Sequence, residues 1–467
     1  MWFGLLLLSY LTALIYVLRL SRNADVGPAG EKSYRFADSN IGSVLGVLTF
    51  SATLFSTFTL LGLPDFFRNH GVGAWIFLGV TDMAMAFLAL WFGLKVREKI
   101  SVQEFESVSE MLAKTYHADW VRFIYWVGIF VFLLPYIAIQ IKGVSGFLSV
   151  AFPLDIPNWS WSLFILLAIL IYSHLGGLKA IIYNDAIQGI ILLSITLLIA
   201  AICLDQMGGW NSMFEQIEER NPKLLSIPGP TGLLNTQFLI ASFLTIVLMP
   251  ISQPQLFTRF TVMRDERSMI EMLLGMSVFV FLIITPTIAI GMYGAINYPD
   301  LSAGEFWVNT FVNDQPEIIG ALAVLGLLAA AMSTADSQLF ALESEVSPTI
   351  QTHSFRKLPS LIFAIMAFGL AVLSSSELVL LATVSFAGTS LLAPMILLAI
   401  LSKDGEHPPL LIPVVCGGSL LIYLESLLSG FVPQVIFGYS LELLLLTLNA
   451  IIVGFFHFLR GQSRVTR

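Results

Sequence analysis

The chain has 467 residues, of which 57% are hydrophobic and only 12% are charged, with a net charge of −8 and a mean hydropathy of +0.84. A soluble domain carries about 25% charged residues, which is twice the supply of this chain. The composition therefore excludes a soluble enzyme, a nucleic-acid-binding protein and a disordered chain. Cys203 and Cys416 both lie within apolar runs, which argues against a disulfide framework or a metal cluster.

Thirteen apolar stretches, bounded by charged residues, Gly or Pro, predict helices that cross a bilayer. The hydrocarbon core requires about 20 residues of helix, so the short fifth and tenth stretches are expected to extend into their flanks. The stretches run over residues 2–18, 41–63, 72–94, 123–150, 161–172, 186–203, 238–258, 270–293, 318–340, 360–374, 378–401, 410–428 and 438–459. The sequence thus predicts an all-α integral membrane protein of about 13 transmembrane helices.

The basic residues predict the orientation, because cytoplasmic loops collect Lys and Arg. With 13 spans and an outside N-terminus, 19 of the 23 Lys and Arg residues fall in inside segments, Arg259 among them. Three fall in outside segments, and Lys142 lies within a span. We therefore expect the N-terminus outside and the C-terminus in the cytoplasm, in a cell membrane such as a bacterial inner membrane.

Two of the predicted spans contain features that interrupt a helix. The second combines six hydroxyl side chains with a Gly and a Pro: Thr49, Ser51, Thr53, Ser56, Thr57, Thr59, Gly62 and Pro64. The seventh reads Met-Pro-Ile-Ser-Gln-Pro-Gln over residues 249–255. Small hydroxyl residues also serve as simple helix contacts. However, the two spans lie five apart, the spacing at which inverted-repeat transporters place their discontinuous helices.

Ionisable side chains at bilayer depth cost at least ~2.5 kcal/mol, so they are candidate functional residues. The candidates are Asp82, Lys142, Asp336, Glu425 and Glu442, with Asp185 at the entry to the sixth span. For Glu425 and Glu442, in the last two spans, we expect structural hydrogen bonding. In the ninth span, Ser333, Asp336 and Ser337 share one helix face, and their oxygens suit a hard cation such as Na⁺.

Four motifs resemble those of the sodium:solute symporters. Residues 176–188 are similar to the Gly-Gly…Ala…Thr-Asp…Gln signature of that family. Residues 51–64 resemble its first core helix, most closely that of the sodium/proline symporter. Residues 253–260 and 330–334 resemble its sixth and eighth core helices. The motifs occur in the family's order on the matching spans, so the resemblance covers most of the chain.

The resemblance implies a LeuT-type fold, in which two five-helix inverted repeats follow one extra helix and precede two others. Its implied boundaries are 1–40 for the first helix and a cytoplasmic loop, 41–203 for the first repeat, 204–237 for an extracellular loop, 238–401 for the second repeat, and 402–467 for two helices and a cytoplasmic tail. The implied activity is symport of a small organic solute with Na⁺ by alternating access. No organic cofactor is expected.

The resemblance also assigns a main Na⁺ site between the first and eighth core helices. Its ligands would be the carbonyls of Ala52, Phe55 and Ala330 and the hydroxyls of Ser333 and Thr334.

A second ion site, present in some members, would use Asp185, Ser333, Asp336 and Ser337. Many members have a hydroxyl at the position of Asp336. Two carboxylates in a dry site separate their protonation steps, so proton-coupled or mixed-ion symport through Asp185 and Asp336 is an alternative.

The solute is expected to bind between the two broken helices, on unwound backbone and polar side chains. The candidates are Ser56, Thr57, Thr59, Gln253, Gln255, Gln140 and Lys142. Lys142 could pair with a solute carboxylate or extend to the outer interface. Asp82 could orient the solute or hydrogen-bond the first core helix. A small carboxylate or amino acid is favoured over a sugar, but Leu54 stands where the proline symporter has an acidic residue, which argues against proline.

A solute sensor is the alternative from another functional class, because domains that resemble this family also occur fused to histidine kinases. The chain ends at Arg467 without a kinase segment, which favours transport. The six His residues are scattered, with no nucleophile and base in a catalytic spacing, so we do not expect an enzyme. The sequence contains no feature that defines an oligomeric state.

Overall fold

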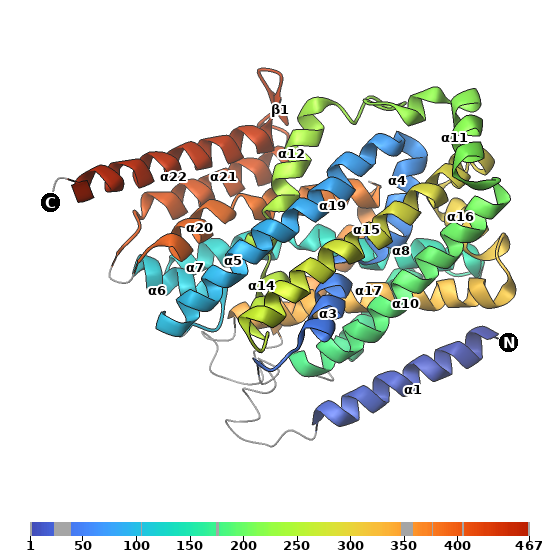
Figure 1. Ribbon diagram of the computed structural model, residues 1–467, viewed down its shortest axis with the longest axis horizontal. Helices are drawn as coiled ribbons and strands as arrows, with labels where there is room; N and C mark the ends of the chain where they lie inside the picture. The colour runs from blue at the N-terminus through green and yellow to red at the C-terminus, as the bar shows by residue number, and fades with distance from the viewer. Residues whose placement is uncertain are drawn as a thin grey trace.

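The computed structural model describes residues 2–22, 39–103, 105–173, 177–346, 358–375, 377–403 and 406–465, and it is almost entirely helical (Figure 1). The first half contains α1 (Trp2–Arg22), α3 (Ser43–Leu54), η2 (Phe58–Gly62), α4 (Leu63–His70), η3 (Val72–Ala74), η4 (Ile76–Val80), α5 (Thr81–Gln103), α6 (Val108–Tyr116), α7 (Val121–Phe132), α8 (Leu134–Ala151), α9 (Trp159–Ser173), α10 (Leu178–Gln206) and α11 (Gly209–Arg220). The second half contains η5 (Pro222–Leu225), α12 (Thr236–Val247), α13 (Met249–Ser252), α14 (Pro254–Thr261), α15 (Glu266–Asn297), α16 (Ala303–Val308), η6 (Asn309–Asn313), α17 (Glu317–Val346), α18 (Leu358–Leu373), α19 (Leu378–Ser390), α20 (Ala393–Leu401), α21 (Leu411–Leu428), the strands β1 (Val435–Ile436) and β2 (Tyr439–Ser440), and α22 (Leu441–Val465).

Each predicted span coincides with an apolar helix or with a chain of consecutive helical segments. In the described part of the chain, seven helices are long and apolar enough to cross a membrane, and two bent helix pairs raise this number to nine. Four further apolar helices are shorter: Trp159–Ile171, Thr236–Val247, Leu358–Leu373 and Leu441–Phe456. The predicted helical membrane protein is therefore confirmed, whereas the number of 13 spans and the orientation stay predictions.

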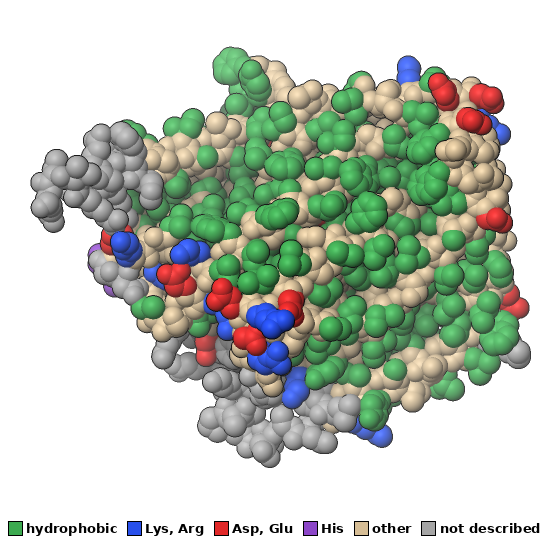
Figure 2. Space-filling model, viewed as in Figure 1, with side chains coloured by type: hydrophobic (Ala, Val, Ile, Leu, Met, Phe, Trp, Pro, Cys, Tyr) green, Lys and Arg blue, Asp and Glu red, His purple; other side chains and the backbone are tan. Residues whose placement is uncertain are grey.

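The surface also has the character of a membrane protein. Figure 2 shows a broad apolar area on one face, with charged side chains gathered near α11 at one end and around the start of α15 at the other. Large apolar side chains are widely exposed, such as Phe87 on α5 at 74% and Val278 on α15 at 60%. An apolar area of this extent needs lipid to cover it, which makes the chain a multi-pass membrane protein.

The two interrupted spans break in the same way. α3 ends at Leu54, and Phe55 has extended backbone angles of −95° and 125° before the chain bends by 61° into the next helical segments. α13 ends at Ser252, and Gln253 has nearly the same angles, −97° and 122°. Pro254 then begins α14, where its missing N–H removes no helical hydrogen bond.

The first break does not lie at a proline. Pro64 lies in the first turn of α4, where Pro is tolerated, and the helix is interrupted about nine residues earlier, among the hydroxyl side chains. Those side chains replace the lost backbone hydrogen bonds. The N–H of Phe58 donates to Ser56 Oγ, and the N–H of Ser56 donates to Thr59 Oγ1, both at 3.2 Å.

The start of helix α10 shows why a boundary predicted from apolar residues alone was wrong. The sequence predicted this span to begin at residue 186, with Asp185 at its entry, but α10 begins at Leu178. Asn184, Asp185 and Gln188 are all 1% exposed or less, because α10 packs against α3, α15 and α17 in the interior. Polar residues that face protein instead of lipid do not end a membrane helix.

Candidate functional site

The broken end of α3 lies against the straight helix α17. Because α3 ends at Leu54, its last carbonyls have no N–H of a following helical turn to accept from. Ser333 Oγ lies 3.0 Å from the carbonyl oxygens of both Ala52 and Ala330. Thr334 Oγ1 lies 3.4 Å from the carbonyl oxygen of Ala52 and 3.3 Å from that of Thr53.

This group of oxygens, which we call the carbonyl–hydroxyl cluster, has more acceptors than protons. Ser333 and Thr334 each carry one hydroxyl proton, yet together they make four close contacts with carbonyl oxygens. All of these residues are 1% exposed or less. A buried excess of neutral oxygen acceptors is the donor set that a hard cation such as Na⁺ requires.

The structure brings together four of the five groups predicted for the main Na⁺ site. Ala52, Ala330, Ser333 and Thr334 meet in the carbonyl–hydroxyl cluster. Phe55 follows directly on the extended segment, and its carbonyl makes no hydrogen bond with either hydroxyl. Among the residues that the structure describes, no three His, Cys, Asp or Glu side chains gather as metal ligands, so this cluster offers oxygen ligands of a different kind.

A buried arginine lies where the second ion site was expected. Nη2 of Arg259, on α14, has three acceptors within hydrogen-bond distance for its two protons: Asp185 Oδ2 at 2.9 Å, Thr53 Oγ1 at 2.8 Å and Ser337 Oγ at 2.7 Å. Thr49 Oγ1 donates to the same carboxylate oxygen at 2.7 Å. Four separate helices, α3, α10, α14 and α17, thus meet on one guanidinium that is 1% exposed.

Arg259 was missed as a site residue. The sequence analysis counted it among the cytoplasmic basic residues, whereas in the folded chain it is buried and paired with Asp185. Its apolar neighbours Phe257 and Phe260, within a motif shared with a transporter family, were the available signal. A charged residue flanked by buried aromatic residues is better interpreted as a paired interior charge.

Asp336 lies beside this ion pair but does not join it. It is fully buried, and neither of its carboxylate oxygens has a hydrogen-bond partner on another element of the described chain. It interacts electrostatically with Asp185 and Arg259. Of the four residues predicted for the second ion site, Asp185 and Ser337 contact Arg259, Ser333 belongs to the carbonyl–hydroxyl cluster, and Asp336 stands apart.

Several solute candidates hold the two breaks in shape. Gln140, on α8, accepts from the N–H of Thr57 at 3.3 Å and donates to Ser56 Oγ at 3.1 Å. At the second break, Gln253 donates to Thr389 Oγ1 at 3.4 Å. Gln255 donates to Gln253 Oε1 at 2.6 Å. The hydroxyl of Thr57 and Oε1 of Gln255 are buried without a hydrogen-bond partner in the described chain, so both can bind a further polar group.

Three other polar candidates have different surroundings. Lys142 Nζ donates to the carbonyl of Ser374 at 2.9 Å, just beyond the carboxyl end of α18, where a cation interacts favourably with the helix dipole. Glu425 accepts from the N–H of Val432 at 2.7 Å and stabilises the turn after α21. Asp82, in the first turn of α5, makes no hydrogen bond with α3 or with any other described element, although it is only 8% exposed.

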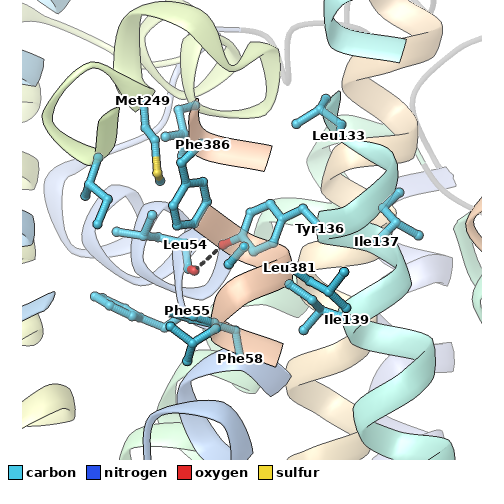
Figure 3. Packing of buried hydrophobic residues seen from close by; sticks show 14 of the residues in the cluster. Leu54, Phe55, Phe58, Leu133, Tyr136, Ile137, Ile139, Met249, Leu381 and Phe386 are labelled. Atoms are coloured by element: carbon cyan, nitrogen blue, oxygen red, sulfur yellow. Dashed lines mark hydrogen bonds between the residues drawn. The ribbon is translucent and has the colours of Figure 1, made fainter. Parts of the chain in front are cut away.

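Two tyrosines within the predicted apolar stretch 123–150 each contact a helix break. Tyr136 donates its hydroxyl to the carbonyl of Leu54 at 2.9 Å, as Figure 3 shows. Tyr125 donates to the carbonyl of Ser252 at 3.2 Å. Each hydroxyl thus satisfies a carbonyl that the interrupted helix leaves without an N–H. A Tyr within a predicted span gives no sequence signal for such a role, because its ring fits the apolar pattern.

Comparison with known proteins identifies the family of this chain and several relatives. The profile of the sodium:solute symporter family matches residues 34–405. The sodium/proline symporter of Escherichia coli is 22% identical, over 93% of this chain and 89% of its own length. The osmoregulated proline transporter OpuE of Bacillus subtilis is 24% identical, over 88% and 87%. The sodium/pantothenate symporter of Haemophilus influenzae is 24% identical over 64% of this chain, and that match spans only 62% of the relative's length.

Solved transporters share the fold. A Na⁺-coupled sialic acid symporter, in a substrate-bound outward-open state, has a TM-score of 0.77 at 17% identity, over 97% of this chain and 96% of its own. A nucleobase-cation-symport-1 family transporter in a closed conformation has a TM-score of 0.52 at 12% identity, over 89% and 92%. These likenesses confirm the predicted LeuT-type fold. Because the family profile covers most of its length, this chain belongs to the sodium:solute symporter family, whose members are transporters and not enzymes.

Proposed function

We propose that this protein couples Na⁺ entry to the uptake of a small organic solute by alternating access. The contact between Ser333 and Thr334 on α17 and the freed carbonyls of Ala52 and Thr53 on α3 carries the proposal. It joins a discontinuous helix to a straight one through oxygen atoms alone. The names of the sodium/proline and sodium/pantothenate relatives support the same activity.

The geometry suggests how the ion would drive transport. A Na⁺ ion in the carbonyl–hydroxyl cluster would bind α3 and α17 at the same time, so it would favour the conformation in which the two helices are close. Entry of one positive charge down a membrane potential supplies about 2.3 kcal/mol per 100 mV. In a cytoplasm with little Na⁺, loss of the ion would separate the two helices and release the solute.

The proposal includes two inverted repeats, at residues 41–203 and 238–401. They belong to a chain of 13 transmembrane helices whose N-terminus lies outside the cell. The matching backbone angles of Phe55 and Gln253, at breaks five spans apart, support this division. The four shorter apolar helices, added to the nine longer spans and bent pairs, support the number 13. The bacterial relatives support a location in the inner membrane.

A proton as a coupling ion is the second candidate, and the burial of Asp336 without a partner on another element favours it. A protonated carboxyl group would avoid the cost of an unpaired charge at that depth. In proteoliposomes, separately imposed Na⁺ and pH gradients distinguish the two ions by which of them drives accumulation. A solute sensor would bind solute but accumulate none under either gradient.

The Na⁺ site can be tested before the solute is known. Binding of Na⁺ to the purified protein should raise its thermal unfolding temperature when Na⁺ replaces K⁺ at constant ionic strength. With Ser333 and Thr334 both changed to Ala, the Na⁺ concentration for half of this effect should rise about tenfold or more, because two ligands are lost.

Ser344→Ala is the matched control. Ser344 also lies on α17, but its hydroxyl donates only to the carbonyl of Phe340 in its own helix, at 2.9 Å. It should therefore keep the Na⁺ response of the unmodified protein. The same Na⁺ midpoint in the double variant and in the control would place the ion elsewhere.

A further inference from the structure

The segment between α21 and α22, which contains β1 and β2, is uncharged. α21 ends at Leu428 and α22 begins at Leu441, and residues 429–440 between them include no Asp, Glu, Lys, Arg or His. By contrast, α11, which precedes α12 in the loop after α10, carries three Glu and one Arg. Loops in water normally carry such charges, so the 429–440 hairpin has the composition of an element that contacts something apolar.

Large apolar side chains of this hairpin are nevertheless exposed. Phe437 is 95% exposed and Phe431 is 87% exposed, and Val435 and Tyr439 are more than half exposed. Figure 1 shows the hairpin projecting from the helices beside α12 and α22, and Figure 2 shows hydrophobic side chains at its tip. Exposed aromatic residues that gather on a projecting segment indicate an interaction surface.

The backbone at the tip does not account for its aromatic residue. The strands pair Val435 with Ser440 and Ile436 with Tyr439, so Phe437 and Gly438 form a two-residue turn. Both have positive φ, 51° and 81°, as a type I′ turn requires. Asn or Asp usually precedes the Gly of such a turn, because a bulky side chain at positive φ is strained. A contact outside the chain would offset the strain at Phe437.

Hydrogen bonds fix the hairpin on the neighbouring helices. Gln237, in the first turn of α12, donates Nε2 to the carbonyl of Gly438, and its Oε1 accepts from the N–H of Ser440 at 3.0 Å. On the other side, Glu425 of α21 accepts from the N–H of Val432 at 2.7 Å. The tip is therefore held away from the helices, and its ring is not free to pack on them.

The surface that continues from the hairpin identifies its partner. α21 and α22 are apolar helices, and Leu421 on the first and Ile451 on the second are each 64% exposed on the surface that lipid must cover. The hairpin connects these two helices directly, so it leaves them at the membrane surface. Aromatic side chains are enriched at that level, where the rings contact lipid and polar groups such as the Tyr hydroxyl reach water.

We propose that the 429–440 hairpin inserts Phe431, Phe437 and Tyr439 into the lipid headgroup region of the leaflet at the α11 end. The hairpin is then a membrane anchor. Because Gln237 links it to α12, the helix that leads through α13 to the second break, contact with lipid also fixes the beginning of that interrupted span.

Fluorescence quenching in vesicles locates the tip. Cys203 and Cys416 are buried, so a nitrobenzoxadiazole label can be attached to the full-length Phe437→Cys protein, which is then placed in phosphatidylcholine vesicles. A lipid with a nitroxide on its headgroup should quench this label more strongly than a lipid with a nitroxide in mid-chain, or than iodide on both sides of the membrane. The exposed control Glu219→Cys, on α11, should respond to iodide. Leu421→Cys, within α21, should respond most to the mid-chain nitroxide.

A second variant tests whether the ring itself is the anchor. Phe437→Asn suits the turn better than Phe does, so the hairpin should be retained while its apolar tip is lost. A label at Val435→Cys should then be quenched several-fold less by the headgroup nitroxide than in the protein that keeps Phe437. Phe214→Asn, the same change on α11, should leave the quenching of that label unchanged.

Three results would overturn the inference. If iodide quenches the label at position 437 as strongly as the label at position 219, and nitroxide lipids do not, the hairpin lies in water. Protection from both reagents would mean that protein, such as a second copy of this chain, covers the tip. If Phe437→Asn leaves the quenching at position 435 unchanged, the ring does not anchor the hairpin.

Discussion

At the scale of single residues, the interior of this protein depends on paired charges. Arg259 and Asp185 come from helices that are far apart in the sequence and are 1% and 0% exposed. The three polar contacts of Arg259 Nη2, with Thr53, Asp185 and Ser337, hold α3, α10 and α17 around α14. A buried ion pair adds little net stability over apolar packing, but removal of one partner leaves the other charge unpaired.

This reasoning gives a double-mutant prediction. Arg259→Met should cost about 3–5 kcal/mol because it leaves Asp185 buried without a cation. Adding Asp185→Asn should restore part of that loss, so the effects of the two substitutions should not be additive. Thermal unfolding of the purified variants measures both the loss of stability in Arg259→Met and its partial recovery in the double variant. Arg267→Met, which breaks an exposed pair with Glu271, should change stability little. Additive losses would show that the pair is not coupled.

At the scale of elements, α4, the second half of the first broken helix, is anchored at its carboxyl end. His70, the last residue of α4, lies 2.7 Å from Thr231 Oγ1 through Nδ1 and 3.1 Å from Glu377 Oε2 through Nε2. The next residue, Gly71, has a φ of +91°, and a Cβ atom there would lie 2.3 Å from the carbonyl oxygen of Leu224. The segment η5 thus packs directly on the end of α4.

Gly71→Ala should therefore displace η5 from α4. Lys223, which is exposed within η5, should then be cleaved by trypsin several-fold faster than in the unmodified protein. Gly209→Ala separates this clash from backbone strain, because Gly209 has a φ of +90° but no atom near its missing Cβ. Equal cleavage rates at Lys223 in both variants would mean that backbone strain, and not the close packing of η5 on α4, protects this segment from trypsin.

At the scale of the whole molecule, the charge distribution predicts an orientation that can be measured. Cys203 and Cys416 are buried, so single introduced cysteines give clear labelling in the native protein. A membrane-impermeant maleimide applied to intact cells should label Glu219→Cys, on exposed α11. It should label Arg264→Cys, before α15, only after permeabilisation. The reverse pattern would invert the proposed topology, and labelling of both from outside would contradict the span count.

The span pattern and the family motifs were readable from the sequence because each is contained in a short stretch of chain. Lipid forces every backbone group to be satisfied within its segment, so hydropathy alone predicts the helices. Spacing and composition also identified the two interrupted spans. The position of the first break was not predicted, because the hydroxyls of Ser56 and Thr59 replace its backbone hydrogen bonds without the aid of Pro64.

Which buried polar groups meet could be seen only in the folded chain. Arg259 was counted as a loop residue, Tyr136 lay unremarked within an apolar stretch, and the role of Asp82 had two alternatives. Each depends on side chains that are distant in the sequence, such as Thr53, which lies 206 residues from Arg259. The free energy of a charge in a membrane protein is set by those distant partners and by the exclusion of water. Composition contains no information on the distant partners or on the exclusion of water. Which interior charges pair is therefore decided only when the helices have packed.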